Sequence, residues 1–237
     1  MCTVTYLPLG NSEFILTSNR DERVNRAADY PKPYRVFDTL AIFPRDKEAK
    51  GTWFAATSNR FTLCLLNGAF EKHKHNPPYR KSRGLMLLDF FRFNDVKTFI
   101  NEYDFSGIEP FTLLIFDKQK IISIDEIRWD GTRFFHELKD ARQPHIWSSA
   151  TLYSRQTIRE REQWFRDFLD HHPEYSENDI LQFHHFGGRG DKANDLMMNR
   201  DNFLKTVSIT SVTKRNDYAY ITYEDTLRHK IYQRRIS

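Results

Sequence analysis

Runs that alternate between apolar and polar residues recur along the chain and predict short strands. Residues 3–7 and 13–18 form two such runs on either side of Gly10-Asn11, which predicts a β-hairpin at the start of the chain. Further strands are expected at 51–56, 61–66, 111–116, 121–127, 132–138, 145–148, 206–212, 218–223 and 228–232.

Apolar residues spaced three or four apart predict helices at 84–93, 154–171 and 178–186. The segment 27–34 carries two prolines and is expected to be a loop. This order of elements predicts an α+β fold in which helices cover sheets. Because no linker or change of composition interrupts the pattern, we expect a single domain over residues 1–237.

Composition and charge narrow the class of protein. Hydrophobic residues make up 39% of the chain and Phe alone contributes 20, which predicts an ordered, Phe-rich core. The net charge is only +4, and acidic and basic residues are intermixed, so we do not expect a nucleic-acid partner. The basic clusters at 72–74, 80–83 and 228–235 are interpreted as solvated surface.

Cysteine usage points to a reducing compartment. The chain has two cysteines, too few for a disulfide framework, and no apolar run resembles a signal peptide or a membrane span. We therefore expect a cytoplasmic protein. Cys64 lies inside an apolar run and is interpreted as a core residue.

Cys2 is the main candidate for chemistry. Removal of Met1 would make Cys2 the N-terminal residue, whose α-amino group titrates at about 7.7 to 8.0. One residue would then supply both a thiol nucleophile and its base, an arrangement suited to attack on an amide or thioester carbonyl. By position alone, an ordinary second residue without a function is the favoured interpretation of Cys2.

A charged motif at the end of the second strand favours the functional interpretation. Antiparallel pairing of the two strands is expected to bring Arg20 and Asp21 beside Cys2. A guanidinium would favour the thiolate, and a carboxylate would hydrogen-bond the amine and the Arg. The alternative is a charged turn at a hairpin end.

These motifs resemble those of a known family. Met1-Cys2-Thr3 followed by Asn19-Arg20-Asp21-Glu22 resembles the family named after the Asn-Arg-Asp-Glu motif, also called the transport and Golgi organisation family. The resemblance continues at 51–53, 65–67 and 82–84 and covers about the first 90 residues well. It implies the N-terminal nucleophile hydrolase architecture, a four-layer αββα sandwich.

The start of the chain is also similar to bile-salt hydrolases and penicillin V acylases. That similarity implies that Cys2 is the nucleophile, that Arg20 and Asp21 assist it, and that Asn67 donates to the oxyanion. It also implies substrate contacts from Asn19, Glu22, Ser148 and Ser149, the two serines standing where those enzymes use a second Asn. For the late Arg of those hydrolases, Arg200 is only one possible counterpart.

Metal and cofactor sites are not expected. His73-Lys74-His75 and His184-His185 lack acidic or thiol ligands at a recognised spacing, so the metal prediction is none. The glycines at 187–190 follow a helix rather than a strand and do not form a dinucleotide fingerprint. No cofactor is predicted, and no axial ligand for haem is evident.

The sequence therefore supports two hypotheses. In the first, the chain is a Cys2 amidohydrolase that acts on a non-peptide C–N bond of a small N-acyl amide. In the second, it is a non-catalytic carrier or trafficking protein that binds an apolar ligand, a lipid or haem, in the same cleft. The sequence does not indicate an oligomeric state.

Overall fold

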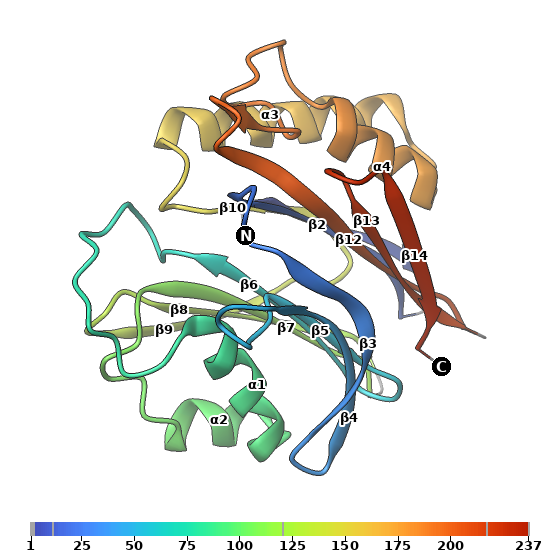
Figure 1. Cartoon of the computed structure of the whole chain (residues 1–237). Coiled ribbons are helices and arrows are strands. Elements are labelled where there is room, and N and C mark those ends of the chain that lie inside the picture. Colours follow the sequence, from blue (N-terminus) through green and yellow to red (C-terminus); the bar gives the residue numbers. More distant parts are fainter. Residues whose placement is uncertain (1–2, 11, 120, 217, 237) are drawn as a thin grey trace.

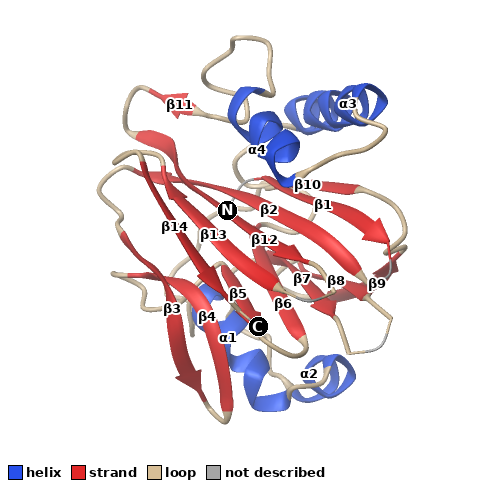
Figure 2. Cartoon of the chain, turned by 90° about the vertical axis from the view of Figure 1, so that its right-hand side faces the viewer, coloured by secondary structure: helices blue, strands red, loops and turns tan. Residues whose placement is uncertain are grey.

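The computed structural model describes residues 3–10, 12–119, 121–216 and 218–236. Two β-sheets lie face to face, with helices on both outer sides (Figure 1). The predicted α+β class and its four-layer αββα order are confirmed by this arrangement (Figure 2). Among the described residues, no helix has both the length and the apolar character needed to cross a membrane.

The first sheet, sheet A, has the strand order β10-β1-β2-β12-β13-β14, with β11 paired to β12. Its strands are β1 (Thr3–Gly10), β2 (Glu13–Arg23), β10 (His145–Ser148), β11 (Asn199–Arg200), β12 (Leu204–Lys214), β13 (Ala219–Asp225) and β14 (Lys230–Arg235). All of its pairings are antiparallel. The predicted N-terminal hairpin is confirmed, because β1 pairs with β2 from Thr3–Asn19 to Gly10–Glu13.

The second sheet, sheet B, follows chain order from β3 to β9. Its strands are β3 (Ala28–Val36), β4 (Thr39–Asp46), β5 (Phe54–Thr57), β6 (Phe61–Asn67), β7 (Phe111–Asp117), β8 (Ser123–Trp129) and β9 (Phe134–Lys139). This meander of neighbouring strands needs only short connections, apart from the segment between β6 and β7, which carries two helices.

One expectation for this sheet was wrong, because the segment predicted as a loop over 27–34 is mostly strand β3. Both of its prolines lie within the strand, although proline donates no backbone hydrogen bond. Strand β3 tolerates them because it is the edge of sheet B and carries a register shift between Asp29 and Lys32.

The helices form the outer layers. Helices α1 (Arg83–Phe93) and α2 (Val96–Glu102) cover sheet B, and α3 (Arg155–His171) and α4 (Glu177–Phe186) cover sheet A. Apolar side chains of α1 and α2, including Phe90 and Phe99, pack against Leu63 and Leu65 of β6. On the other side, Phe165 and Phe183 pack on Leu7 and Ile15.

The core between the two sheets is built by strand alternation. Val4 and Tyr6 of β1, and Phe14 and Leu16 of β2, point between the sheets and meet residues of sheet B such as Phe116. The intervening residues of both strands point toward α3 and α4. Successive residues of β1 and β2 therefore belong alternately to two separate layers.

Candidate active site

The start of β1 lies inside sheet A rather than at its edge. Thr3 is opposite Asn19 of β2 on one side and Ser148 of β10 on the other. Cys2 precedes Thr3 in the sequence and lies outside the described residues. The structure therefore describes the surroundings of Thr3, and the role of Cys2 stays a prediction.

The charged motif at the end of β2 is divided between the two faces of the strand. Arg20 and Glu22 line a cleft at the ends of the sheets. Asn19 and Asp21 point the other way, toward α4 and the segment that follows β10. All three of Asn19, Arg20 and Asp21 are at least 95% buried, so the motif is an internal one.

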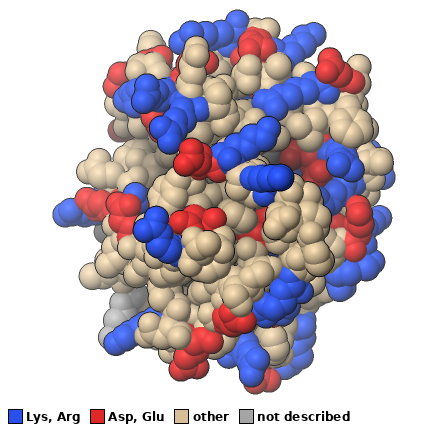
Figure 3. Space-filling view, turned by 90° about the vertical axis from the view of Figure 1, so that its left-hand side faces the viewer, with Lys and Arg blue, Asp and Glu red and all other residues tan. Residues whose placement is uncertain are grey.

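The cleft has a volume of about 370 Å³. Its wall is formed by the end of β2 and the residues after it, the turn between β4 and β5, the end of β6, and the segment that begins α1. The lining residues are Arg20, Glu22, Arg26, Asp46, Ala49, Gly51, Thr52, Trp53, Leu65, Asn67, Tyr79, Lys81, Ser82, Arg83, Gly84 and Glu109. Charges of both signs border this space, and they also intermingle over the face of the molecule in Figure 3.

Arg20 is held in place on three sides. Its Nη2 donates to Oδ2 of Asp46 at 2.8 Å, and its Nη1 donates to the carbonyl oxygen of Arg26 at 2.9 Å. Its guanidinium carbon lies 4.3 Å from the centre of the Trp53 ring, within range of a cation–π contact. Burial lowers the pKa of Arg20, and Glu22 and Asp46 oppose that effect. Among the described residues, the carboxylate partner of Arg20 is thus Asp46 and not its neighbour Asp21.

Asn67 ends β6 and contributes to the cleft wall. Its carbonyl oxygen accepts a hydrogen bond from Oγ of Ser149 at 2.8 Å, which ties the segment after β10 to the end of β6. Within the described part of the chain, the side-chain amide of Asn67 forms no hydrogen bond. The amide is therefore available to a ligand in the cleft.

The two predicted serines do not line the cleft. Ser149 is 1% exposed and acts through the backbone of Asn67. Ser148 pairs with Thr3 and therefore shares the face of sheet A that Thr3 presents to the helices. Asn19 also lies on that face. Substrate contacts from Asn19, Ser148 and Ser149 remain predictions without support from the cleft geometry.

Two short motifs of the sequence, residues 51–53 and 82–84, meet at the cleft. A Cβ on Gly51 would lie 2.4 Å from the backbone carbon of Gly84, and the amide of Thr52 donates to the Gly84 carbonyl at 3.2 Å. Ser82 caps the first turn of α1 by accepting from the Leu85 amide. The two glycines thus allow α1 to begin directly against the turn between β4 and β5.

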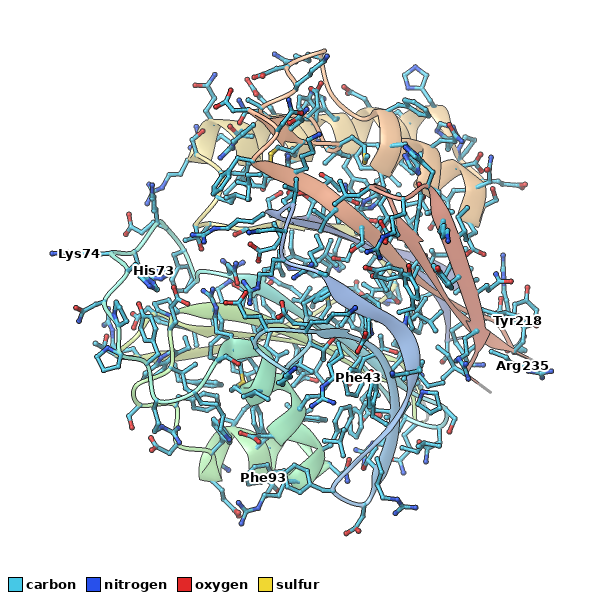
Figure 4. The ribbon with its side chains drawn as sticks, in the orientation of Figure 1. Phe43, His73, Lys74, Phe93, Tyr218 and Arg235 are labelled. Atoms are coloured by element: carbon cyan, nitrogen blue, oxygen red, sulfur yellow. The ribbon has the colours of Figure 1, made fainter. Side chains whose placement is uncertain are left out.

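A partly buried ion pair continues this wall. Nη2 of Arg83 lies 2.9 Å from Oε2 of Glu109, whose other oxygen lies 3.1 Å from Nε2 of His73 and 3.2 Å from Nδ1 of His75. Burial alone would raise the pKa of Glu109, but Arg83 and the two histidines outweigh it and lower the pKa. In Figure 4, His73 turns toward the body of the molecule, whereas Lys74 extends away from it.

On the helix side of sheet A, His184 of α4 is fully buried against β1 and β2. Its Nδ1 lies 2.7 Å from Oδ1 of Asn19, and its Nε2 lies 2.7 Å from Oγ1 of Thr5. The amide nitrogen of Asn19 donates to the carbonyl of Leu196 at 2.8 Å, so Oδ1 is the atom that faces the ring. We infer that Nδ1 carries the proton and Nε2 accepts from Thr5. Burial, with smaller contributions from His185 and Arg161, lowers the pKa of His184 to about 3.

A second buried network lies beside the first. Asp21 accepts hydrogen bonds from Thr206 at 2.5 Å and from the hydroxyl of Tyr153. Arg161 lies over the Tyr153 ring, with 3.6 Å from its guanidinium carbon to the ring centre, and donates to Oγ1 of Thr3. Arg161 is fully buried and also donates to the carbonyls of Asn194 and Asp195. This network holds Thr3, the residue that follows Cys2, in place.

Arg200, the possible counterpart of a late Arg, belongs to the same side. It lies 5.4 Å from the Tyr153 ring centre and donates to the carbonyls of Ala193 and Leu152. It is absent from the cleft wall.

Sequence reasoning thus identified Arg20, Glu22 and Asn67 as residues that the structure brings to one cleft, and it missed Asp46, Arg26 and Glu109. Asp46 ends β4, a strand that was not expected, so no pattern marked it. The roles of His184 and Arg161 were also missed, because helix amphipathicity does not identify a polar residue that faces the core. Tyr153 was missed because it lies just before α3, outside any expected element. In the described ranges, no group of three or more His, Cys, Asp or Glu is placed to hold a metal ion.

A second, larger cavity of about 680 Å³ lies at the opposite end of the sheets. It is bordered by the far ends of β1 and β2 and by the start of β8, and its wall includes Tyr6, Ile122 and Ile124. None of the motif residues lies there. The smaller cleft is therefore the candidate active site.

Comparison with known proteins identifies related structures and the family of this chain. The chain is similar in structure to two variants of conjugated bile acid hydrolase from Clostridium perfringens. One matches with a TM-score of 0.60 and 9% identity over 100% of this chain and 92% of that one. The other matches with a TM-score of 0.57 and 8% identity over 99% of this chain and 92% of that one. At this identity, the likeness establishes the fold alone.

A comparison with curated proteins found no significant match. The model of one protein family, described as Transport and Golgi organisation 2, matches residues 1–226. The match spans the N-terminal hairpin, the cleft and both helical layers, so the chain belongs to the Transport and Golgi organisation 2 family.

Proposed function

We propose that this protein is an N-terminal-cysteine amidohydrolase that cleaves the C–N bond of a small, non-peptide N-acyl amide, with Cys2 as nucleophile. The observation that carries the proposal is the convergence of Arg20 and Asn67 from two different sheets on one cleft. Strand β1 begins at Thr3, the residue after Cys2, and pairs with β2, the strand that carries Arg20.

In the proposed reaction, loss of Met1 frees the α-amino group of Cys2. The amine takes the thiol proton, directly or through water, as the sulfur attacks the carbonyl carbon of the substrate. The side-chain amide of Asn67 donates to the resulting oxyanion. Collapse of the tetrahedral species breaks the C–N bond, the proton passes to the leaving amine, and water then hydrolyses the thioester to release the acid.

Arg20 and Asp21 have separate parts in this proposal. Arg20 presents positive charge to the cleft and favours the thiolate by opposite charge. Asp21 stands on the other face of β2, where its hydrogen bonds with Tyr153 and Thr206 fix the end of the strand. A reducing, cytoplasmic compartment would keep the thiol of Cys2 free.

The charged lining of the cleft supports the hydrolase over the carrier. An apolar ligand in this space would be buried against Arg20, Glu22, Asp46 and Glu109 and would exclude water from them at a cost. A polar amide and its oxyanion make use of the same groups. The carrier hypothesis for this cleft predicts full ligand binding by a Cys2→Ala variant.

The decisive experiment is the intact mass of the purified protein before and after a limiting dose of a thiol-reactive probe at pH 7. The proposal expects loss of Met1 and rapid labelling of Cys2 alone. It further expects turnover of at least one compound in a panel of N-acyl amides, abolished in Cys2→Ala and lowered about 10²- to 10³-fold in kcat in Asn67→Ala. Retained Met1, or labelling no faster than that of a free thiol, would refute the mechanism.

A further inference from the structure

We propose that Asp46 is a positioning residue of the cleft, which fixes the Arg20 guanidinium so that its remaining N–H donors serve a substrate oxygen. This inference rests on the proposed function. It assigns a role to a residue that lies outside the Asn-Arg-Asp-Glu motif and comes from the other sheet.

Asp46 is itself rigidly held. Its Oδ1 accepts from the backbone amides of Glu48 at 3.0 Å and Ala49 at 2.8 Å, and it is 5% exposed. The backbone around it closes the turn, because the Asp46 amide donates to the Gly51 carbonyl and the Lys50 amide donates to the Asp46 carbonyl, each at 2.9 Å. Its carboxylate therefore has little freedom to rotate.

The other oxygen of Asp46 faces two arginines. Oδ2 lies 2.8 Å from Nη2 of Arg20 and 3.0 Å from Nε of Arg26. Arg26 has a second carboxylate partner in Glu22, at 2.7 Å, whereas Asp46 is the only carboxylate paired with Arg20 among the described residues. Loss of the Asp46 charge would thus leave a 4% exposed guanidinium without an ionic partner.

Trp53 restricts the same guanidinium from one face. It follows Asp46 along the chain through the turn that Asp46 stabilises, so one turn supplies both the carboxylate and the ring. A carboxylate, a carbonyl and an aromatic face together set the plane and the direction of the guanidinium.

The consequence for a ligand follows from the number of donors. A guanidinium has five N–H groups, and within the described ranges two of those on Arg20 meet acceptors, in Asp46 and the Arg26 carbonyl. The others have no acceptor among these residues, and the side chain forms part of the cleft wall. The geometry suits a ligand that presents a carbonyl, carboxylate or oxyanion oxygen to Arg20.

The test compares Asp46→Asn with Glu48→Gln in the full chain. Glu48 lies in the same turn, but its side chain is 82% exposed, and its Oε2 lies as far as 4.0 Å from Nε of Arg26. Glu48→Gln is therefore the matched control. Circular dichroism establishes that each variant is folded. The first readout is the set of Nη–Hη signals of Arg20 in ¹⁵N-labelled protein, assigned by their loss in Arg20→Lys. The second is the pH profile of Cys2 labelling by a thiol-reactive probe.

We expect slowly rotating, resolved Nη–Hη signals for Arg20 in the wild type and in Glu48→Gln, and their loss in Asp46→Asn. We also expect the midpoint of the pH profile of Cys2 labelling to move to higher pH in Asp46→Asn. The labelling rate at pH 7 should fall about tenfold for each pH unit of that shift. Formate added to Asp46→Ala should restore part of the rate, which a purely structural role of Asp46 would not produce. Should Asp46→Asn fail to fold, Asp46→Glu replaces it, and a shifted pH profile is expected.

The two proposals fail in different ways. Wild-type Arg20 signals in a folded Asp46→Asn variant would overturn the present inference, whatever the reactivity of Cys2. A wild-type Cys2 that reacts like a free thiol would refute the proposed hydrolase, while loss of the Arg20 signals in Asp46→Asn would still support the positioning role.

Discussion

At the scale of single residues, neighbouring positions of one strand serve separate layers. Arg20 and Glu22 face the cleft, whereas Asn19 and Asp21 organise the contact between sheet A and the helices. A substitution at Asn19 is therefore expected to act through stability, and one at Arg20 through the chemistry of the cleft.

The buried His184 predicts a pH-dependent stability. Its pKa in the folded protein is about 3, below the usual value of 6.5, so only the unfolded chain binds its proton between these values. The free energy of unfolding should therefore decrease as the pH falls from 6.5 toward 3, by about 1.4 kcal/mol per pH unit from this residue. Urea denaturation at several pH values measures the slope.

The matched variant is His184→Gln, because a Gln amide offers one donor to Asn19 and one acceptor to Thr5 without a titrating group. It should have a shallower slope than the wild type over the same range. Equal slopes would show that His184 does not titrate in this way. Carboxylates contribute equally to both proteins and cancel in the difference.

Part of this residue-level arrangement could be predicted from the sequence, and part could not. The candidate residues Arg20 and Asn67 came from motifs, and both line the cleft. The sequence did not predict that Asp21 lies on the opposite face of the strand from Arg20. The second strand was expected to end at Ser18, whereas β2 continues to Arg23 and keeps its alternation. A polar partner supplied by a distant element, such as His184 for Asn19, leaves no local pattern.

At the scale of elements, the contact between Gly51 and Gly84 joins α1 to sheet B. Gly51 has an ordinary negative φ, so a substitution there tests the close approach and not backbone strain. The only way to accommodate a Cβ is to move backbone, because its nearest atoms belong to the main chain of Gly84 and Leu85.

Gly51→Ala is therefore expected to lower the free energy of unfolding by about 1 to 3 kcal/mol or more and to disturb the cleft. Thermal or chemical denaturation measures the loss. Gly190→Ala is a useful control, because its Cβ would meet no atom within 4 Å and only its positive φ carries a cost. A Gly51→Ala variant as stable as the wild type would contradict the close approach.

Elements were predictable where their pattern was strong. The helices at 154–171 and 178–186 and most strands were expected within a few residues of their observed bounds. Strand β3 was not expected, because its prolines favour turns except at a sheet edge. Strand β4 and helix α2 were missed altogether. The neighbours of a strand decide whether it tolerates proline, and sequence alone does not reveal them.

At the scale of the whole molecule, the two sheets enclose the thiol of Cys64. Cys64 is fully buried between them, and burial raises its pKa to about 12 although a hydrogen bond with Ser18 opposes that effect. A probe can reach this sulfur only when the sheets separate.

Labelling of Cys64 in the native protein should accordingly be at least about 10³-fold slower than that of a free thiol, and should become complete in denaturant. A Cys2→Ser variant isolates Cys64, and intact mass over time gives its rate. Fast labelling of Cys64 under native conditions would show that the sheets open locally.

The order of strands in sheet A has a consequence for biosynthesis. The N-terminal hairpin emerges first, but the neighbour of β2 is β12, which begins only at Leu204. The ribosome adds about 5 to 20 residues per second, so the β2 edge of the hairpin stays open for many seconds. Nascent chains stalled before β12 should therefore recruit chaperones to that open edge.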